Sequence, residues 1–367
     1  MLIVILIIVL FSSLVLVHEW GHFVMARRNG VGADEFGIGF PPRLWGKKVH
    51  GTLYSVNLLP LGGFVRMKGE DNGDTRPGTF GGASTWSKTK ILLAGVVMNL
   101  VSAFLILYVL CLTGLPGLGA PFEPGFVHSS YAQPKRLILT EVEAGSPAAK
   151  AGLARGDYII SGNGTTFVSE DQLESFTKAN AGKTVTFHVS AKGDERDVKV
   201  TLRGPNATNG YLGVVGQQVY KLRYSPAAAV AAAAYITAVL FGATIWGVIL
   251  LIVNIPALLA GLFSSTVPQA AQNASGPLGI IFIFKSISAL GFSYIFLFMA
   301  NIGVALAAFN VLPLPALDGG RLALILWQRA VKRQIDPDTE ARIHTYGFIG
   351  LMALIVVISV YDFRKYF

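Results

Sequence analysis

The stretch Leu14-Val15-Leu16-Val17-His18-Glu19-Trp20-Gly21-His22 decides how this sequence is interpreted. Residues 1–17 contain no charged side chain, so ionisable groups follow directly on a segment apolar enough to enter a membrane. Such groups are costly at membrane depth and usually mark a functional site. In a helix, His18 and His22 lie one turn apart on one face, where two imidazoles can bind the same metal ion. Glu19, beside the first histidine, can take up a proton without being a metal ligand.

The composition indicates an integral membrane protein. Only 14% of the residues are charged and 52% are hydrophobic, whereas soluble proteins carry about 25% charged residues. The net charge of +9 comes from Lys and Arg near the ends of apolar runs, which favours a membrane topology and excludes a nucleic-acid partner. The single cysteine, Cys111, excludes an internal disulfide and a cysteine-based zinc cluster.

Apolar runs predict a polytopic α-helical membrane protein with about four transmembrane helices. They lie in the first run and at residues 91–112, 235–253 and 346–361. The first run is either an anchor or a signal peptide; no Lys or Arg precedes it and no small-residue cleavage pattern follows, which favours the anchor. Arg27 and Arg28 after it predict that the chain continues on the cytoplasmic side.

Two regions have less regular patterns. Residues 51–59 alternate and 60–71 have a strand-and-turn pattern, which predicts a β-hairpin that is either membrane-associated or a cytoplasmic loop. Residues 254–272 suit an interfacial, amphipathic excursion, and 281–309 suit either a re-entrant pair or a further span.

Residues 115–225 have the composition of a soluble α+β domain. Ser146-Pro147 predicts the start of a short helix that ends at Gly152, and Asn163-Gly164 predicts a tight turn. A helix at 169–180 and strands at 184–190 and 197–202 are predicted to follow.

A catalytic zinc site needs a third protein ligand. Of the other histidines, His128 and His188 lie in or beside the predicted domain, while His50 and His344 lie in polar flanks. Asp318 stands beside Gly319-Gly320 in apolar surroundings. Asp318 either caps the helix that follows or supplies the missing ligand. When Asp318 is considered alone, capping is the better explanation. When it is considered together with His18 and His22, the role of metal ligand is the better explanation.

The sequence resembles the site-2 protease family of intramembrane zinc metalloproteases, and most of all its bacterial members with an extracytoplasmic PDZ domain. The motifs that carry the resemblance are His18 to His22, Gly37 to Pro42, Pro60 to Glu70, Ala94-Gly95 with Asn99, Gly276 to Ile280, and Asn310 to Gly320. Within residues 115–225, the Gly-Ser-Pro-Ala-Ala pattern and the late segment Gly210-Tyr211-Leu212-Gly213-Val214 resemble a circularly permuted PDZ domain. The chain has room for one such domain, unlike better-known members with two in tandem.

The resemblance implies that Zn²⁺ is bound by His18, His22 and Asp318, with Glu19 as the general base. It further implies that Asn310, Pro313 and Pro315 shape or contact the substrate near the metal. We also expect an exposed strand edge, at Thr52 to Leu59, to hold an unwound substrate segment by strand addition.

The expected protein is therefore a protease of the bacterial inner membrane that cleaves transmembrane segments of single-span proteins. Its domains are predicted as membrane region 1–114, PDZ domain 115–225 and membrane region 226–367. The active site should face the cytoplasm and the PDZ domain, which would bind a peptide or protein C-terminus, should be extracytoplasmic. Its other expected partner is the lipid bilayer. The alternatives are a catalytically silent membrane PDZ receptor and, less favoured, a metal transporter.

Overall fold

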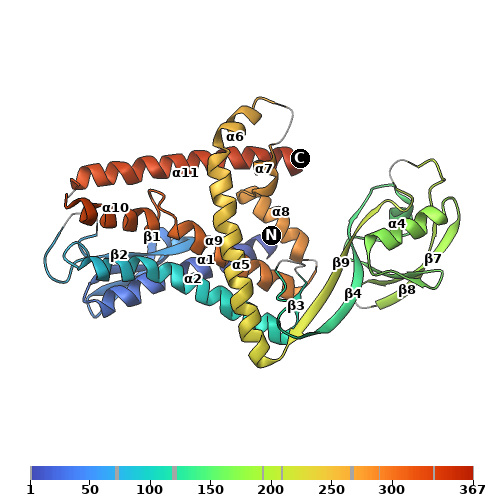
Figure 1. The fold of residues 1–367 in the computed structure, drawn as a ribbon, viewed down its shortest axis with the longest axis horizontal. Helices are drawn as coiled ribbons and strands as arrows, with labels where there is room; N and C mark the ends of the chain where they lie inside the picture. The colour runs from blue at the N-terminus through green and yellow to red at the C-terminus, as the bar shows by residue number, and fades with distance from the viewer. Residues whose placement is uncertain are drawn as a thin grey trace. The chain divides into compact units, whose positions relative to one another are not determined.

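The computed structural model describes residues 2–70, 74–117, 122–191, 194–207, 210–264, 268–288, 290–333 and 335–366. They form two compact units (Figure 1). The helical unit comprises residues 1–107, 233–285 and 295–367, and the sheet unit comprises residues 108–232 and 286–294.

Among the described residues, five helices are long and apolar enough to cross a membrane. They are α1 (Leu2–Arg28), α2 (Thr85–Thr113), α5 (Pro226–Val253), α9 (Phe292–Val311) and α11 (Pro337–Tyr366). The prediction of about four was low by one. The region 281–309 holds the end of α8 (Pro277–Ser288) and most of the span α9, with Gly291 at a φ of +102° between them. At 12 residues α8 is too short to span a membrane. Of the two alternatives for residues 281–309, the further span is therefore the one that the structure contains, as α9.

Among the described residues, three further short helices besides α8 lie in the helical unit: α6 (Ile255–Gly261), α7 (Gln269–Asn273) and α10 (Asp318–Val331). The last turns of α11 hold the segment that contains α6 to α8. The hydroxyl of Tyr361 donates to the Leu258 carbonyl at 2.5 Å, and the buried Asp362 accepts the Gly279 N–H at 2.8 Å. The predicted excursion at 254–272 is thus fixed to the final helix.

A hairpin is present, but its strands are β1 (Ala33–Val49) and β2 (Thr52–Met67): the two predicted stretches, 51–59 and 60–71, lie mostly within the single strand β2, and its partner β1 precedes both. β2 doubles back, so that Phe36 of β1 pairs with Val65 on one side and with Tyr54 on the other. Tyr54 pairs in turn with Lys47. The predicted free edge at Thr52 to Leu59 is therefore wrong, because its central residues have a neighbour on both sides.

The hairpin packs against α1 through an aromatic cluster. Phe23 of α1 and Phe36 of β1 are buried there, with Leu16, Tyr54 and Val65 packed around them. This contact places the second half of β2 beside the helix that carries His18 and Glu19.

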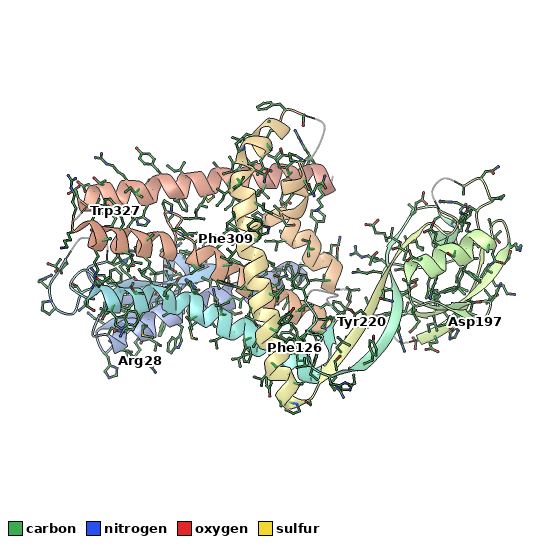
Figure 2. The ribbon with its side chains drawn as sticks, viewed as in Figure 1. Arg28, Phe126, Asp197, Tyr220, Phe309 and Trp327 are labelled. Atoms are coloured by element: carbon green, nitrogen blue, oxygen red, sulfur yellow. The ribbon has the colours of Figure 1, made fainter. Side chains whose placement is uncertain are left out.

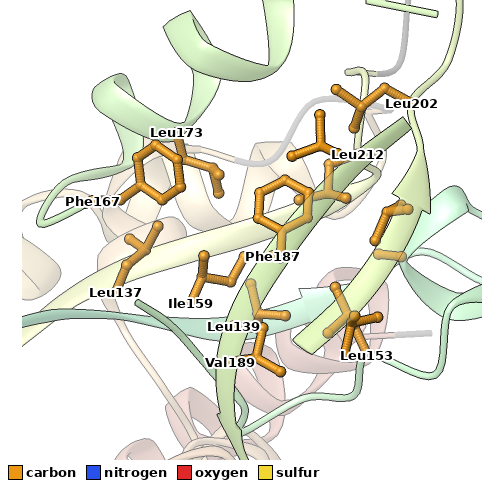
Figure 3. Close-up of a cluster of buried hydrophobic side chains, with 14 residues drawn as sticks. Leu137, Leu139, Leu153, Ile159, Phe167, Leu173, Phe187, Val189, Leu202 and Leu212 are labelled. Atoms are coloured by element: carbon orange, nitrogen blue, oxygen red, sulfur yellow. The ribbon is translucent and has the colours of Figure 1, made fainter. Parts of the chain in front are cut away.

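The sheet unit contains a seven-stranded sheet in the order β3-β9-β4-β5-β7-β8, with β6 beside β5. Its elements are β3 (Leu115–Pro116), β4 (Ser129–Val142), α3 (Pro147–Lys150), β5 (Tyr158–Gly162), β6 (Thr165–Thr166), α4 (Glu170–Ala179), β7 (Thr184–Ala191), β8 (Asp194–Thr201) and β9 (Val214–Tyr224). Phe167, Leu173 and Phe187 are among the side chains of its buried core (Figure 3).

The local predictions for this unit are confirmed. The Ser146 hydroxyl accepts the Ala149 N–H at 3.1 Å and caps α3. Asn163 and Gly164 both have positive φ, which forms the tight turn between β5 and β6. Ser169 caps α4.

Candidate metal centre

The side chains of His18, His22 and Asp318 meet, although 300 residues separate the first from the last. Nε2 of His18 lies 3.0 Å from Oδ2 of Asp318 and 3.0 Å from Nε2 of His22. Nε2 of His22 lies 3.2 Å from the same Oδ2. The two imidazoles are 9% and 6% exposed and the Asp318 carboxylate is 24% exposed. Among the described residues, only this group brings three or more His, Cys, Asp or Glu ligand atoms within 4.8 Å of one another.

Asp318 reaches the histidines because of where α10 begins. Leu317 occupies the N-cap position and Asp318 is the first helical residue. The capping interpretation of Asp318 is therefore wrong: its carboxylate lies against the two imidazoles of α1. Gly319 and Gly320 make this start possible, since a β-carbon at either position would collide with backbone carbonyls of Val311, Leu312 and Leu314.

The segment before α10 is held by α11. Ala316 has a φ of +77°, and its N–H donates to Nδ1 of His344 at 3.0 Å. No sequence motif selects His344, which stands in a polar flank. In the structure it fixes the backbone two residues before Asp318.

Arg321 fixes α10 from its other side. Its guanidinium forms an ion pair with the Glu70 carboxylate and donates to the Glu70 carbonyl at 2.7 Å. Arg321 also lies over the Phe80 ring, with its Cζ 5.0 Å from the centroid. Asp318 and Arg321 are three residues apart on the same helix, so this anchor lies within one turn of the centre.

Both imidazoles have a partner on the nitrogen that faces away from the centre. Nδ1 of His22 donates to the carbonyl of Ile91 at 2.8 Å, which leaves its Nε2 free to bind a metal. Nδ1 of His18 lies 3.2 Å from Nδ2 of the fully buried Asn99. Oδ1 of Asn99 has no hydrogen-bond partner among the described residues. A half-turn of this amide would make Oδ1 the acceptor for a proton on Nδ1 and would free Nε2 of His18 as well.

Two glycines let α1 and α2 approach at the centre. A β-carbon at Gly21 would lie 2.6 Å from the Ala94 carbonyl oxygen. A β-carbon at Gly95 would lie 2.5 Å from Nε2 of His22 and 2.7 Å from Nε2 of His18. Gly95 therefore keeps open the space in front of the ligand atoms.

The donor set and its dimensions suit zinc. Zn²⁺ binds imidazole nitrogen and carboxylate oxygen at roughly 2.0–2.2 Å, and tetrahedral ligands at that length are roughly 3.3 Å apart. The three separations of 3.0, 3.0 and 3.2 Å are close to this value. Three protein ligands also leave one position open, as in catalytic zinc sites.

Glu19 lies beside this group without belonging to it. Its Oε2 accepts the N–H of Val65 in β2 at 3.0 Å. The doubled-back hairpin therefore orients this carboxylate, which the motif alone did not reveal.

The three other predicted site residues lie at the end of α9 and in the segment between α9 and α10. Asn310 is half-buried in the last turn of α9, Pro313 is exposed and Pro315 is half-buried. Pro315 packs against Gly347 of α11. In the described part of the chain, the Asn310 side chain has no hydrogen-bond partner, so its substrate role stays a prediction.

Comparison with known proteins identifies relatives over nearly the whole chain. A sequence profile described as Peptidase family M50 matches residues 6–354. A protein of Clostridium acetobutylicum, provisionally named a zinc metalloprotease, is 28% identical over 98% of this chain and 96% of its own length. The regulator of sigma-W protease RasP from Bacillus subtilis is 26% identical over 99% of both chains. The chloroplastic membrane metalloprotease ARASP of Arabidopsis thaliana is 27% identical over 98% of this chain and 79% of its own.

Several relatives are named zinc metalloproteases, and proteases of family M50 use Zn²⁺, so the predicted cofactor is confirmed. The match covers nearly the whole chain, including all five apolar helices in whole or in part. The chain therefore belongs to peptidase family M50, the site-2 protease family of membrane zinc metalloproteases.

Proposed function

We propose that this chain is an intramembrane protease that hydrolyses peptide bonds within the transmembrane segments of single-span proteins, with zinc held by His18, His22 and Asp318. One observation carries the proposal: the ligand atoms of His18, His22 and Asp318 converge. The two histidines lie on the same helix as Glu19, α1, and this helix is apolar enough to lie in a membrane. Neither a receptor that binds protein termini nor a transporter needs a carboxylate held beside such a group.

Zinc, when bound, supplies a Lewis acid that makes water nucleophilic near neutral pH and polarises a peptide carbonyl. Glu19 accepts the proton of the attacking water and passes it to the amine that leaves. The Val65 N–H keeps the Glu19 carboxylate turned towards the centre during both transfers. Asn99 and the Ile91 carbonyl hold the two imidazoles in place.

A transmembrane substrate helix must unwind before its carbonyls can be attacked, because they are hydrogen-bonded within the helix. The second half of β2 offers an edge for the unwound segment. Among the described residues, 63–67 pair with 33–38 on one side only, and Val65 points its N–H away from that partner towards Glu19. A substrate strand added along this edge would lie beside the general base. Asn310 would contact it from the end of α9, and Pro313 and Pro315 from the segment before α10.

We further propose that residues 115–225 of the sheet unit form an extracytoplasmic PDZ domain of the circularly permuted type, inserted between membrane regions 1–114 and 226–367. In support, Tyr211-Leu212-Gly213 leads directly into β9, and β9 pairs with β4. A peptide or protein C-terminus would bind along β9 near α4. The regulator of sigma-W protease among the relatives supports a substrate linked to sigma-factor control, such as an anti-sigma factor. We also propose remnant signal peptides as substrates, and a bacterial inner membrane with the active site towards the cytoplasm as the location.

Replacing Glu19 by Gln tests the function. We expect Glu19→Gln to retain its zinc and to lose cleavage, because the ligands stay while the proton acceptor is removed. Asp318→Asn should lose zinc and cleavage together. Zinc content is measured on the purified proteins, and cleavage by comparing membrane-protein fragments in cells that carry each variant. Cleavage by Glu19→Gln at the wild-type rate would refute the mechanism, and equal fragments in cells with and without the wild-type chain would refute the function.

A further inference from the structure

A second, basic cavity lies in the helical unit, outside the metal centre. Its volume is about 540 Å³. It is lined by the start of α2, by α10 and the residues that follow it, by the start of α11 and by parts of the segment 69–81. Neither the metal ligands nor Glu19 contribute to it.

The lining carries an excess of unpaired positive charge. Its cations are Lys88, Arg321, Arg329, Lys332 and Arg333, and its carboxylates are Glu70 and Glu340. Arg321 and Glu70 neutralise each other. In the part of the chain that the structure describes, the remaining four cations and Glu340 form no ion pair. Four positive charges and one negative charge leave a net charge of +3 around the cavity.

The cations are held in place by packing as well as by the backbone. Phe80 is 3% exposed, and its ring lies beneath two of them: Lys88 Nζ is 5.7 Å and Arg321 Cζ is 5.0 Å from the ring centroid. Arg329 lies in the last turn of α10, the helix that also carries Trp327 (Figure 2), while Lys332 is its left-handed C-cap residue and Arg333 follows directly; all three line the cavity. Two separate elements therefore present cations to one cavity.

The cavity lies where lipid headgroups would be. Lys88 is in the first turn of the span α2, beside the exposed Trp86, and Trp at such a position marks the membrane–water interface. Glu340 is likewise in the first turns of the span α11. Basic pockets between transmembrane helices at this level bind anionic headgroups, and arginine matches the geometry of phosphate oxygens.

We propose that this cavity binds a phosphate group, presented by the headgroup of an anionic phospholipid. Arg329, Lys332 and Arg333 would contact the phosphate oxygens from α10, and Lys88 would contact them from α2. The same chemistry would accept a soluble phosphate ester, so the test separates the two sources.

The test uses the full chain in nanodiscs of zwitterionic lipid, titrated with fluorescent phosphatidylglycerol. The cavity variant is Arg329→Gln/Lys332→Asn/Arg333→Gln, in which Asn suits the left-handed backbone of Lys332. The control Arg28→Gln/Lys47→Gln/Lys48→Gln removes as many charges from exposed positions away from the cavity. Lys88→Gln is a second, independent cavity variant. Zinc content and the thermal midpoint show that each variant is folded.

We expect saturable binding to the wild type, weakened tenfold or more in the triple cavity variant and about twofold or less in the control. Lys88→Gln should weaken it about threefold or more. Equal weakening in the cavity and control triples would overturn the proposal in favour of general surface charge, as would binding that does not saturate. Competition by glycerol 3-phosphate separates the sources: weak competition supports the lipid, and binding of glycerol 3-phosphate without binding of the lipid overturns it.

Discussion

The backbone of Gly95 in α2 comes so close to His22 in α1 that a β-carbon at position 95 would lie 2.5 Å from Nε2 of His22. Real β-carbons do not approach other atoms this closely, so Gly95→Ala must push the imidazoles away from Asp318. We expect zinc content to fall to about a tenth of the wild-type value or less, with a matching loss of cleavage. Metal analysis of the purified variant checks this, because it does not depend on a substrate.

Gly303→Ala is the matched control for Gly95→Ala. Gly303 is also a buried glycine in a membrane-spanning helix, but a β-carbon there would be 3.6 Å from its nearest neighbours, Ala103, the Asn99 backbone and Leu14. We expect Gly303→Ala to keep its zinc. Loss of zinc from both variants would mean that any added bulk disturbs the helices, and that the space at Gly95 has no special relation to the metal.

The Glu70–Arg321 ion pair should stabilise the start of α10. Both side chains are mostly buried, at 15% and 21% exposed, so removing one partner leaves a poorly solvated charge. Glu70→Gln and Arg321→Met should each lower the thermal midpoint by several degrees. The thermal midpoint of the double variant should be no lower than that of the less stable single variant, because the two changes break the same interaction.

Arg76→Met is the control for this pair. Arg76 pairs with Asp74 in the neighbouring loop, but its side chain is 82% exposed, and exposed ion pairs contribute little. Its thermal midpoint should stay within about one degree of the wild type. Additive effects of Glu70→Gln and Arg321→Met would show that the two residues act independently.

His188 makes the sheet unit sensitive to pH. Hydrogen bonds to Asp197 and then to Glu195 raise the pKa of His188 above its ordinary value of 6.5. Because the folded-state pKa is the higher one, this histidine stabilises the fold below about pH 6.5 and the contribution disappears as the pH rises through the raised pKa. NMR titration of His188 should give a midpoint above 6.5, and Asp197→Asn should lower it. Asp194→Asn, which removes a carboxylate on the same strand that does not bond to His188, should leave it unchanged.

The parts of the site that could be predicted are those fixed by local spacing. His18, Glu19 and His22 depend only on the helical repeat, and Asp318 followed from the need of zinc for a third ligand. Residues close in sequence also determine three local features: the first residues of the helices capped by Ser146 and Ser169, and the turn at Asn163. The structure contains all three.

The remaining features depend on contacts between distant segments. Glu70 and Arg321 are 251 residues apart, and His344 supports Ala316 from a helix that no motif connects to the site. Gly95 looks like an ordinary packing glycine until α2 is placed against α1. The free edge predicted for β2 is wrong because alternation identifies strands without showing which segments pair. The fifth span stayed one of two alternatives because two apolar runs meet at Gly291.

Asn99 should determine which nitrogen of His18 is free to bind zinc. Its side chain is fully buried and its amide is the group that faces Nδ1 of His18, at 3.2 Å. An acceptor there keeps the proton on Nδ1 and leaves Nε2 for the metal. Asn99→Ala should therefore weaken zinc binding about 10- to 100-fold, measured by competition with a chelator. Asn99→Asp should bind zinc as well as the wild type, because a carboxylate also accepts the proton on Nδ1. Ser102→Ala, on the same helix, loses only a hydrogen bond to the Met98 carbonyl and should leave the zinc affinity unchanged. If Asn99→Asp binds zinc as poorly as Asn99→Ala, Asn99 fills space in the helix contact and does not act as the acceptor for His18.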